Sequence, residues 1–128
     1  MIYLDTSVAL AHLLAEDRSP PPSLWDETLV SSRLLEYELW NRLHARGLAR
    51  SHGDHARELL QRLALLELAP PVLARALEPF ASPVRTLDAL HLASIEFLRE
   101  RRQDIKLASY DTRMVIAARR MGIAVVEL

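Results

Sequence analysis

The sequence predicts an α/β fold, a three-layer α/β/α sandwich around a central, mostly parallel sheet of about five short strands. Short apolar runs that suit strands alternate along the chain with longer segments that suit helices. This alternation favours parallel pairing, with helices on both faces of the sheet. The 128 residues, half of them hydrophobic, are enough for one domain with a core and too few for two ordinary ones. We therefore expect residues 1–128 to form a single domain.

The first half of the chain is expected to contain three of the strands. In order, we expect a strand at 1–4, a helix at 8–16, a strand at 28–31, a helix at 32–46, a helix at 54–63 and a strand at 65–68. Leu35, Leu39 and Leu43 recur every four residues and give the second of these helices an apolar stripe. Either Gly47 or Gly53 is expected to mark the turn before the next helix, which Asp54 is expected to cap.

The second half supplies the other two strands and the most apolar helix. We expect a helix at 72–77, a helix at 87–98, a strand at 106–109, a helix at 112–121 and a strand at 123–126. The helix at 87–98 is apolar on almost every side, so we expect it to be central and buried. Gly122 is expected to end the last helix.

Four carboxylates stand in apolar surroundings, where an ionised acid is costly. Asp5 and Asp111 each follow a predicted strand, and Glu38 and Asp88 lie in leucine-rich helical segments. Buried acids are normally paired with a cation or bound to a metal. Ligands of parallel α/β sheets bind at the carboxyl ends of the strands, where Asp5 and Asp111 are expected. The pattern indicates one metal-binding cleft.

Composition limits the other possibilities. Cysteine is absent, which excludes disulfides, thiolate nucleophiles and cysteine-ligated metal sites and suits a reducing compartment. No uncharged stretch approaches the roughly 20 residues that a membrane helix needs, so we expect a cytoplasmic protein. The net charge is -1, but without the four site acids 16 basic residues face 13 acidic ones, a balance of +3. An acidic pit on a mildly basic body suits a polyanionic substrate brought to bound metal.

Four short motifs contain the four acids: Asp5-Thr6-Ser7, Ser31 to Leu39, Leu87 to Ala93, and Ser109-Tyr110-Asp111. They resemble the motifs of PIN-domain ribonucleases, in particular the VapC-like toxins of toxin-antitoxin pairs. Each motif alone is weak, but the four occur in family order and spacing along the whole chain. Relatives more often have Thr at the position of Ser109, and the hydroxyl is retained here.

The resemblance implies a metal-dependent endoribonuclease. Asp5, Glu38 and Asp88 would be the principal ligands of Mg²⁺ or Mn²⁺, and Asp111 would bind a second ion or act through water. Thr6, Ser7 and Ser109 would support the site. The family pattern selects Glu38 over Glu36, which lies about 200° away around the helix. Expected partners are an RNA substrate, a cognate antitoxin that covers the cleft, and a second copy in a homodimer.

Other interpretations of these residues stay open at this point. Asp5 and Asp111 could be only helix caps, and Asp88 could merely favour the first turn of its helix. The spacing places His91 one turn after Asp88, where packing or support of the site is a simpler role than metal binding. His52 and His55 have zinc-like spacing but no acids predicted nearby. The alternative function is a non-catalytic PIN-like module that binds RNA or protein.

Overall fold

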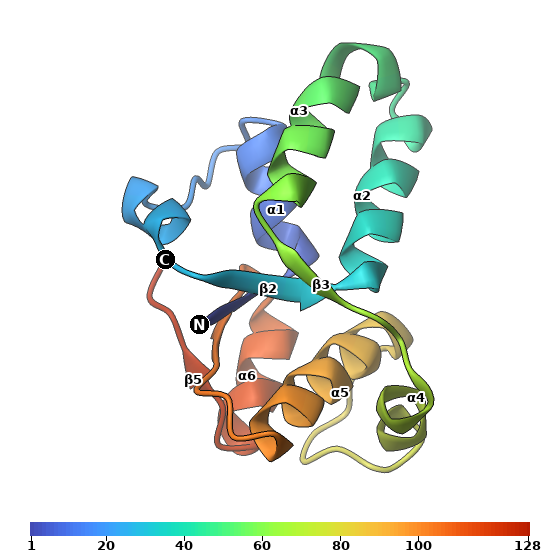
Figure 1. Ribbon diagram of the computed structural model, residues 1–128, viewed down its shortest axis with the longest axis vertical. Coiled ribbons are helices and arrows are strands. Elements are labelled where there is room, and N and C mark those ends of the chain that lie inside the picture. Colours follow the sequence, from blue (N-terminus) through green and yellow to red (C-terminus); the bar gives the residue numbers. More distant parts are fainter.

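Five parallel strands form the centre of the computed structural model, which describes residues 1–128 (Figure 1). The strands are β1 (Ile2–Leu4), β2 (Leu29–Ser32), β3 (Ala64–Leu66), β4 (Lys106–Ala108) and β5 (Ala124–Val125). Their order across the sheet is β3-β2-β1-β4-β5, and every neighbouring pair is parallel. The five-stranded sheet is confirmed, and it is wholly rather than mostly parallel.

Helices cover both faces of the sheet. They are α1 (Thr6–Leu13), α2 (Arg33–Ala45), α3 (Ala49–Gln61), α4 (Pro70–Ala76), α5 (Thr86–Glu100) and α6 (Thr112–Arg120). In Figure 1, α1, α2 and α3 lie above the sheet, whereas α4, α5 and α6 lie below it. A short 3₁₀ helix, Pro22–Asp26, precedes β2. The three-layer α/β/α sandwich is therefore confirmed.

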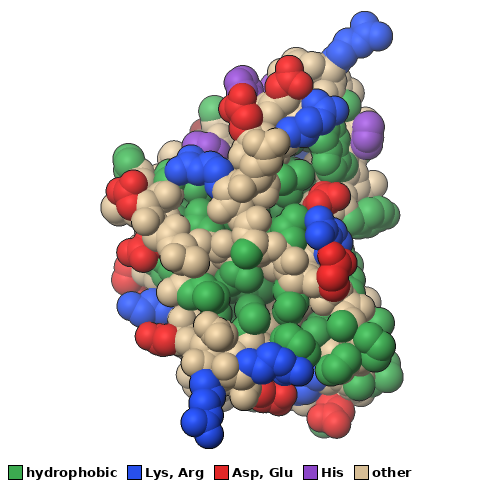
Figure 2. Space-filling view, in the orientation of Figure 1, with side chains coloured by type: hydrophobic (Ala, Val, Ile, Leu, Met, Phe, Trp, Pro, Cys, Tyr) green, Lys and Arg blue, Asp and Glu red, His purple; other side chains and the backbone are tan.

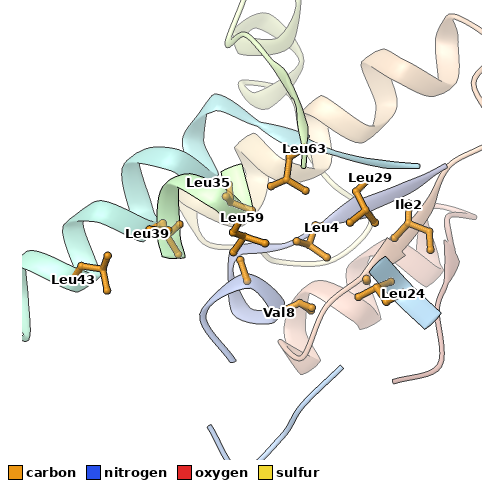
Figure 3. Packing of buried hydrophobic residues seen from close by; sticks show 13 residues of the cluster. Ile2, Leu4, Val8, Leu24, Leu29, Leu35, Leu39, Leu43, Leu59 and Leu63 are labelled. Carbon is orange, nitrogen blue, oxygen red and sulfur yellow. The ribbon is translucent and has the colours of Figure 1, made fainter. Parts of the chain in front are cut away.

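Alternation along β1 divides the hydrophobic core into two clusters. Ile2 and Leu4 point to the α1–α2–α3 side and pack with the buried leucine stripe of α2 (Figure 3). Tyr3 points to the opposite side and packs with α5 and α6. The stripe residues Leu35, Leu39 and Leu43 have no exposed surface. Burial of each such leucine contributes about 1.5–3 kcal/mol, and this burial fixes α2 against the sheet.

The expected turn at Gly53 and the cap at Asp54 are wrong, because α3 runs unbroken from Ala49 to Gln61. Gly53 lies inside this helix, beside Trp40 of α2: a Cβ at this position would be 3.4 Å from the Trp40 ring, an ordinary van der Waals contact. The packing of α3 on α2 therefore does not require a glycine here. Of the two expected turn glycines, Gly47 is the one at the turn, and its φ of +67° is accessible to glycine and strained for other residues.

The other element boundaries agree within a few residues, and the burial predicted for α5 is confirmed for the middle of the helix. Residues 91–95 are all buried, so this part of α5 is enclosed on every side. The start of the helix is more open, since Leu87 is exposed and Leu90 is partly exposed. None of the helices combines the length and the hydrophobicity that a membrane-spanning helix requires.

The topology brings the carboxyl ends of β1 and β4 together. From β1 the chain moves through β2 and β3 toward one edge of the sheet, and then returns to place β4 and β5 on the other side of β1. Such a reversal leaves a crevice at the carboxyl ends of the two central strands. Asp5 follows β1 directly, and Asp111 lies three residues after the end of β4.

Candidate functional site

A cleft of about 500 Å³ opens at the carboxyl ends of β1 and β4, and it contains all four predicted acids. The residues that line it come from α1, α2, the start of α5 and the start of α6. They are Asp5, Thr6, Ser7, Leu10, Glu38, Arg42, Arg85, Thr86, Leu87, Asp88, His91 and Asp111. Only two of these twelve lining residues, Leu10 and Leu87, are hydrophobic, so the cleft suits a charged ligand.

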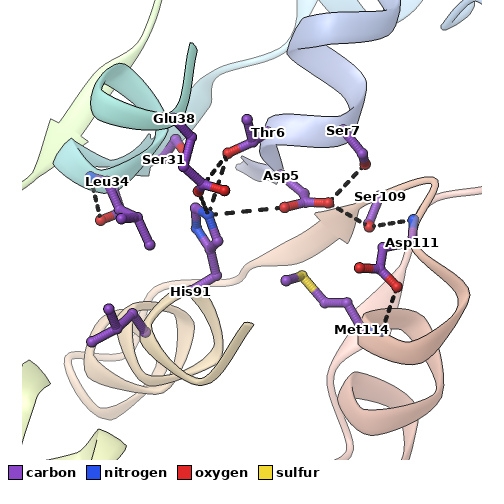
Figure 4. A network of polar contacts seen from close by, with 12 residues as sticks. Asp5, Thr6, Ser7, Ser31, Leu34, Glu38, His91, Ser109, Asp111 and Met114 are labelled. Carbon is purple, nitrogen blue, oxygen red and sulfur yellow. Dashed lines mark hydrogen bonds and ion pairs between the residues drawn. The ribbon is translucent and has the colours of Figure 1, made fainter. Parts of the chain in front are cut away.

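Asp5 is held by two hydroxyl groups at the bottom of the cleft. Its Oδ2 atom accepts hydrogen bonds from Ser7 Oγ at 2.7 Å and from Ser109 Oγ at 2.8 Å (Figure 4). Asp5 occupies the N-cap position of α1, yet its side chain caps no backbone N–H group. A residue whose only role was to cap would use its carboxylate for that bond. The hydrogen bonds of the Asp5 carboxylate therefore differ from those of an ordinary helix cap.

The same two serines join the loops that follow β1 and β4. Ser7 Oγ accepts a hydrogen bond from the Tyr110 backbone N–H at 2.9 Å, and Ser109 Oγ accepts one from the Asp111 N–H at 2.9 Å. Each hydroxyl thus accepts from the backbone of the 109–111 loop and donates to Asp5. This double use fixes the position of Asp5 relative to that loop.

Glu38 reaches the cleft from the second turn of α2. Its Oε1 atom lies 2.9 Å from Thr6 Oγ1, which donates, and 2.7 Å from His91 Nε2. The other nitrogen of this buried ring, Nδ1, lies 2.7 Å from the hydroxyl oxygen of Tyr3. Burial raises the pKa of Tyr3 far above its ordinary value, so its O–H group is available to donate to Nδ1. With the Tyr3 O–H donating to Nδ1, Nε2 carries a proton and donates it to Glu38.

Glu36 faces away from the cleft. It pairs with Arg33 at 2.9 Å on the outer side of α2, and both side chains are well exposed to solvent. Arg33 also contacts Glu67, so this is a small surface network. Of the two acids in the second motif, only Glu38 lines the cleft.

Asp88 has a buried oxygen without a partner. The residue is 8% exposed, in the first turn of α5, and its Oδ2 atom makes no hydrogen bond. Burial raises the pKa of the Asp88 carboxyl above its ordinary value, and the negative charges of Asp111 and Asp5 raise it further. Three carboxylates therefore influence one another electrostatically across the cleft, and one of them offers a free oxygen.

Asp111 differs from Asp5 because it does cap a helix. Its Oδ1 atom accepts hydrogen bonds from the backbone N–H groups of Arg113 at 2.9 Å and Met114 at 3.3 Å, at the start of α6. Asp111 therefore caps α6 through its Oδ1 atom, and its Oδ2 atom forms no hydrogen bond.

The donor set fits a hard divalent cation, although the acids do not form a closed cage. No three acidic or histidine side chains are grouped closely enough to hold an ion as they stand. The available donors are carboxylate oxygens, which Mg²⁺ and Mn²⁺ prefer, and Asp88 Oδ2 has no competing bond. Mg²⁺ keeps several waters when bound and needs only one or two direct carboxylate ligands. The residues present therefore fit the cation by their chemistry.

Two histidines and two arginines lie outside the hydrogen-bond network of the acids. His52 and His55 both lie on α3, neither lines the acidic cleft, and His52 hydrogen-bonds Ser51.

Arg42 and Arg85 line the cleft, a role that the sequence does not predict for them. Nothing in their local sequence distinguishes them from other surface arginines, since their position depends on how α2 and α5 pack.

Comparisons with known proteins agree with this architecture. The family model of the PIN domain matches residues 2–120. Two relatives come from Mycobacterium tuberculosis. Ribonuclease VapC47 is 31% identical, over 95% of this chain and 93% of its own length. Ribonuclease VapC46 is 37% identical, over 98% of this chain and 95% of its own length. A solved structure described as a toxin-antitoxin complex from Klebsiella pneumoniae superimposes with a TM-score of 0.70 and 14% identity, covering 99% of this chain and 97% of that chain, which shows a shared fold. The chain belongs to the PIN-domain family, as a VapC-like member.

Proposed function

We propose that this protein is a metal-dependent endoribonuclease that acts as the toxin of a toxin-antitoxin pair. The observation that carries the proposal is the meeting of Asp5, Asp88 and Asp111 in one cleft, with Asp88 Oδ2 unpaired. Two carboxylates about 5 Å apart repel each other by roughly 3 kcal/mol at an effective dielectric constant of 20. A fold that gathers such groups is expected to gain stability when a cation binds them. The ribonuclease names of the two mycobacterial relatives support RNA as the substrate.

The proposed cation is Mg²⁺ or Mn²⁺, held by Asp5, Glu38, Asp88 and Asp111. When bound, it would supply Lewis-acid chemistry, withdrawing charge from the scissile phosphate and acidifying water for hydrolysis. Asp5 would act from the fixed position that Ser7 and Ser109 give it.

Side chains around the acids would position the RNA. Thr6 and His91 hold Glu38 Oε1, which leaves its other oxygen, Oε2, free of protein hydrogen bonds. Arg42 and Arg85 line the cleft without an acidic partner, so their guanidinium groups are available to phosphate. The cleft would thus combine an acidic floor with cationic walls, as substrate and cation binding both require.

The antitoxin is proposed to lie on an apolar groove beside the cleft. This groove has a volume of about 440 Å³, and its lining includes Leu73, Leu77, Phe80 and Leu90. Leu77 is 88% exposed, and Figure 2 shows hydrophobic side chains gathered over the region where α4 lies in Figure 1. Because Arg85 and Thr86 line both hollows, an amphipathic helix in the groove could extend a basic side chain among the acids. The similar fold of a chain from the Klebsiella toxin-antitoxin complex supports such a partner.

Two further expectations belong to the proposal. We place the activity in the cytoplasm, with cellular RNA as the substrate, and we propose that the protein forms a homodimer. Light scattering after size exclusion measures the second: a mass of about twice 14.5 kDa supports the dimer, and the mass of one chain contradicts it.

The alternative function is a non-catalytic PIN-like module that binds RNA or protein. It would gain nothing from an unpaired, buried carboxylate oxygen, which costs about 1–3 kcal/mol or more. The deciding experiment incubates the purified protein with total RNA and Mn²⁺ and maps new 5′ ends. Wild-type protein should generate discrete ends that EDTA and Asp88→Asn abolish and that Glu36→Gln retains. Ends that persist in Asp88→Asn, with contaminating nuclease excluded, would contradict the metal-nuclease assignment, and no ends at all would favour the binding module.

A further inference from the structure

We propose that a second cavity beside the acidic cleft, the arginine groove, binds the phosphodiester backbone of the RNA substrate outside the point of cleavage. The arginine groove is defined by the side chains of Arg85, Arg113 and Arg120. The inference rests on the proposed ribonuclease function, and it adds a binding site that the acids do not provide.

The arginine groove is a hollow of about 450 Å³ without any acidic residue in its wall. Its lining residues are Ser82, Pro83, Val84, Arg85, Arg113, Ile116 and Arg120. Arg113, Ile116 and Arg120 follow one another at helical spacing along one face of α6, and the loop before α5 forms the facing wall. Two segments far apart in the sequence therefore bring three positive charges into one concave surface.

None of the three guanidinium groups has a protein partner. Their side chains form no ion pair, donate to no carbonyl or carboxylate oxygen, and stack on no aromatic ring. Other arginines of this chain behave differently: Arg75 pairs with Glu96 and Arg119 with Glu127. Like charges gathered without a counter-charge repel one another, so the groove favours an anionic ligand.

The arginine groove continues into the acidic cleft. Arg85 lines both hollows, so a strand whose scissile phosphate lies among the acids can follow Arg85 toward α6 without leaving a cationic surface. Arg85 is also the N-cap residue of the 15-residue helix α5, where no side chain caps the first backbone N–H groups. Those N–H groups and the positive end of the helix dipole add to the attraction for phosphate at the junction.

The lining suits a single nucleic-acid strand better than an acidic peptide. Each guanidinium group can donate two hydrogen bonds to a phosphate. The exposed side chain of Ile116 and the partly exposed side chain of Val84 offer apolar surface to riboses and bases. Contacts to phosphate carry no sequence information, so we expect the groove to strengthen binding of different RNA sequences equally.

The test measures RNA binding separately from cleavage. Fluorescence anisotropy follows two unrelated single-stranded RNAs, each of about 12 nucleotides, on protein carrying Asp5→Asn so that the RNA stays intact. Adding Arg113→Gln and Arg120→Gln should weaken binding of both RNAs by about tenfold at low salt. It should also reduce the slope of log K against log salt by about 1.4, which is about 0.7 for each lost phosphate contact.

A matched control has the same net charge. Arg50→Gln with Arg119→Gln removes two exposed arginines outside the groove, one on α3 and one on α6, and should change binding less than twofold. Equal losses in both double variants would overturn the groove, because total charge alone would explain them. A double groove variant that binds RNA normally but no longer binds poly-glutamate would also overturn it, in favour of an acidic protein partner.

The two proposals can fail independently. If wild-type protein cuts RNA and the groove variant binds RNA as tightly as the control, the groove is wrong and the ribonuclease stands. If no RNA is cut but binding still depends on Arg113 and Arg120, the ribonuclease is wrong and the groove stands.

Discussion

His91 Nε2 lies 2.7 Å from Glu38 Oε1, and this contact joins α5 to α2 across the cleft. Behind it, the Tyr3 hydroxyl contacts Nδ1 of the same ring. A strand residue, a histidine and a cleft acid thus form one buried chain of hydrogen bonds. The position of Glu38 therefore depends on residues from three elements.

Tyr3→Phe should destabilise the protein and reduce cleavage. It removes the donor to His91 Nδ1 and leaves a buried nitrogen unpaired, at a cost of about 1–3 kcal/mol. Urea unfolding measures the loss. Tyr110→Phe is the matched control: the Tyr110 hydroxyl is buried without a partner, so its removal should leave the unfolding free energy equal or higher. The same loss in both variants would contradict a role for the Tyr3 bond.

Glu38→Gln should lose RNA cleavage by orders of magnitude, and Glu36→Gln should retain it. Only Glu38 lines the cleft, whereas Glu36 pairs with Arg33 on the outer surface of α2. Initial rates in Mn²⁺ compare the two variants. If only Glu36→Gln loses activity, the catalytic face of α2 is the one that carries Glu36, and the prediction for Glu38 is wrong.

The stability of the metal-free protein should fall with rising pH because of Asp88. Its folded-state pKa is raised, so its contribution is complete below the ordinary value of 3.8 and is lost as pH rises through the folded-state pKa. Asp88→Asn has no such ionisation and should exceed the wild type increasingly as pH rises from acid toward neutrality. Urea unfolding in EDTA at several pH values tests this difference. A difference that does not vary with pH would mean that Asp88 titrates normally.

Mn²⁺ should stabilise the wild type. A ligand at a hundredfold excess over its Kd that binds only the folded state adds about 2.7 kcal/mol. For a domain of this size the melting temperature should rise on the order of 10 °C. Thermal melts with EDTA and with Mn²⁺ measure the shift, and Asp5→Asn should reduce it. An identical rise in both proteins would indicate binding elsewhere on the surface.

Asp111→Ala and Asp111→Asn should separate capping from chemistry. Alanine removes the acceptor for the Arg113 and Met114 N–H groups and should cost about 1 kcal/mol, whereas asparagine keeps a good cap. If the second carboxylate oxygen serves the cation, both variants should lose cleavage. Thermal melts and initial rates measure the two effects, and full activity in a stable Asp111→Asn would restrict the residue to capping.

The sequence predicts those features that local pattern determines. Apolar runs and leucine spacing indicate the strands and α2, and acids placed after strands indicate the cleft. The course of α3 could not be predicted, because a glycine inside a helix, such as Gly53, gives the same local signal as a glycine at a turn. Likewise Asp5 and Asp111 look alike in sequence, and their hydrogen bonds distinguish their roles. Asp5 accepts from the hydroxyls of Ser7 and Ser109, the second of them 104 residues away, whereas Asp111 accepts from backbone N–H groups of α6. The arginine groove depends on the packing of α6 beside the start of α5.

The position of β1 in the sheet affects when the cleft can form during translation. β1 is the first strand to be made, yet it is the middle strand of the sheet, and one of its two neighbours is β4, where Ile2 pairs with Lys106. Contacts of such wide sequence separation form slowly, since a long loop must close first. A nascent chain that ends before Lys106 has neither this neighbour nor Ser109 and Asp111. The ribosome must therefore have passed Asp111 before the cleft can assemble, because a shorter chain lacks one of the four acids and one of the two hydroxyls that hold Asp5.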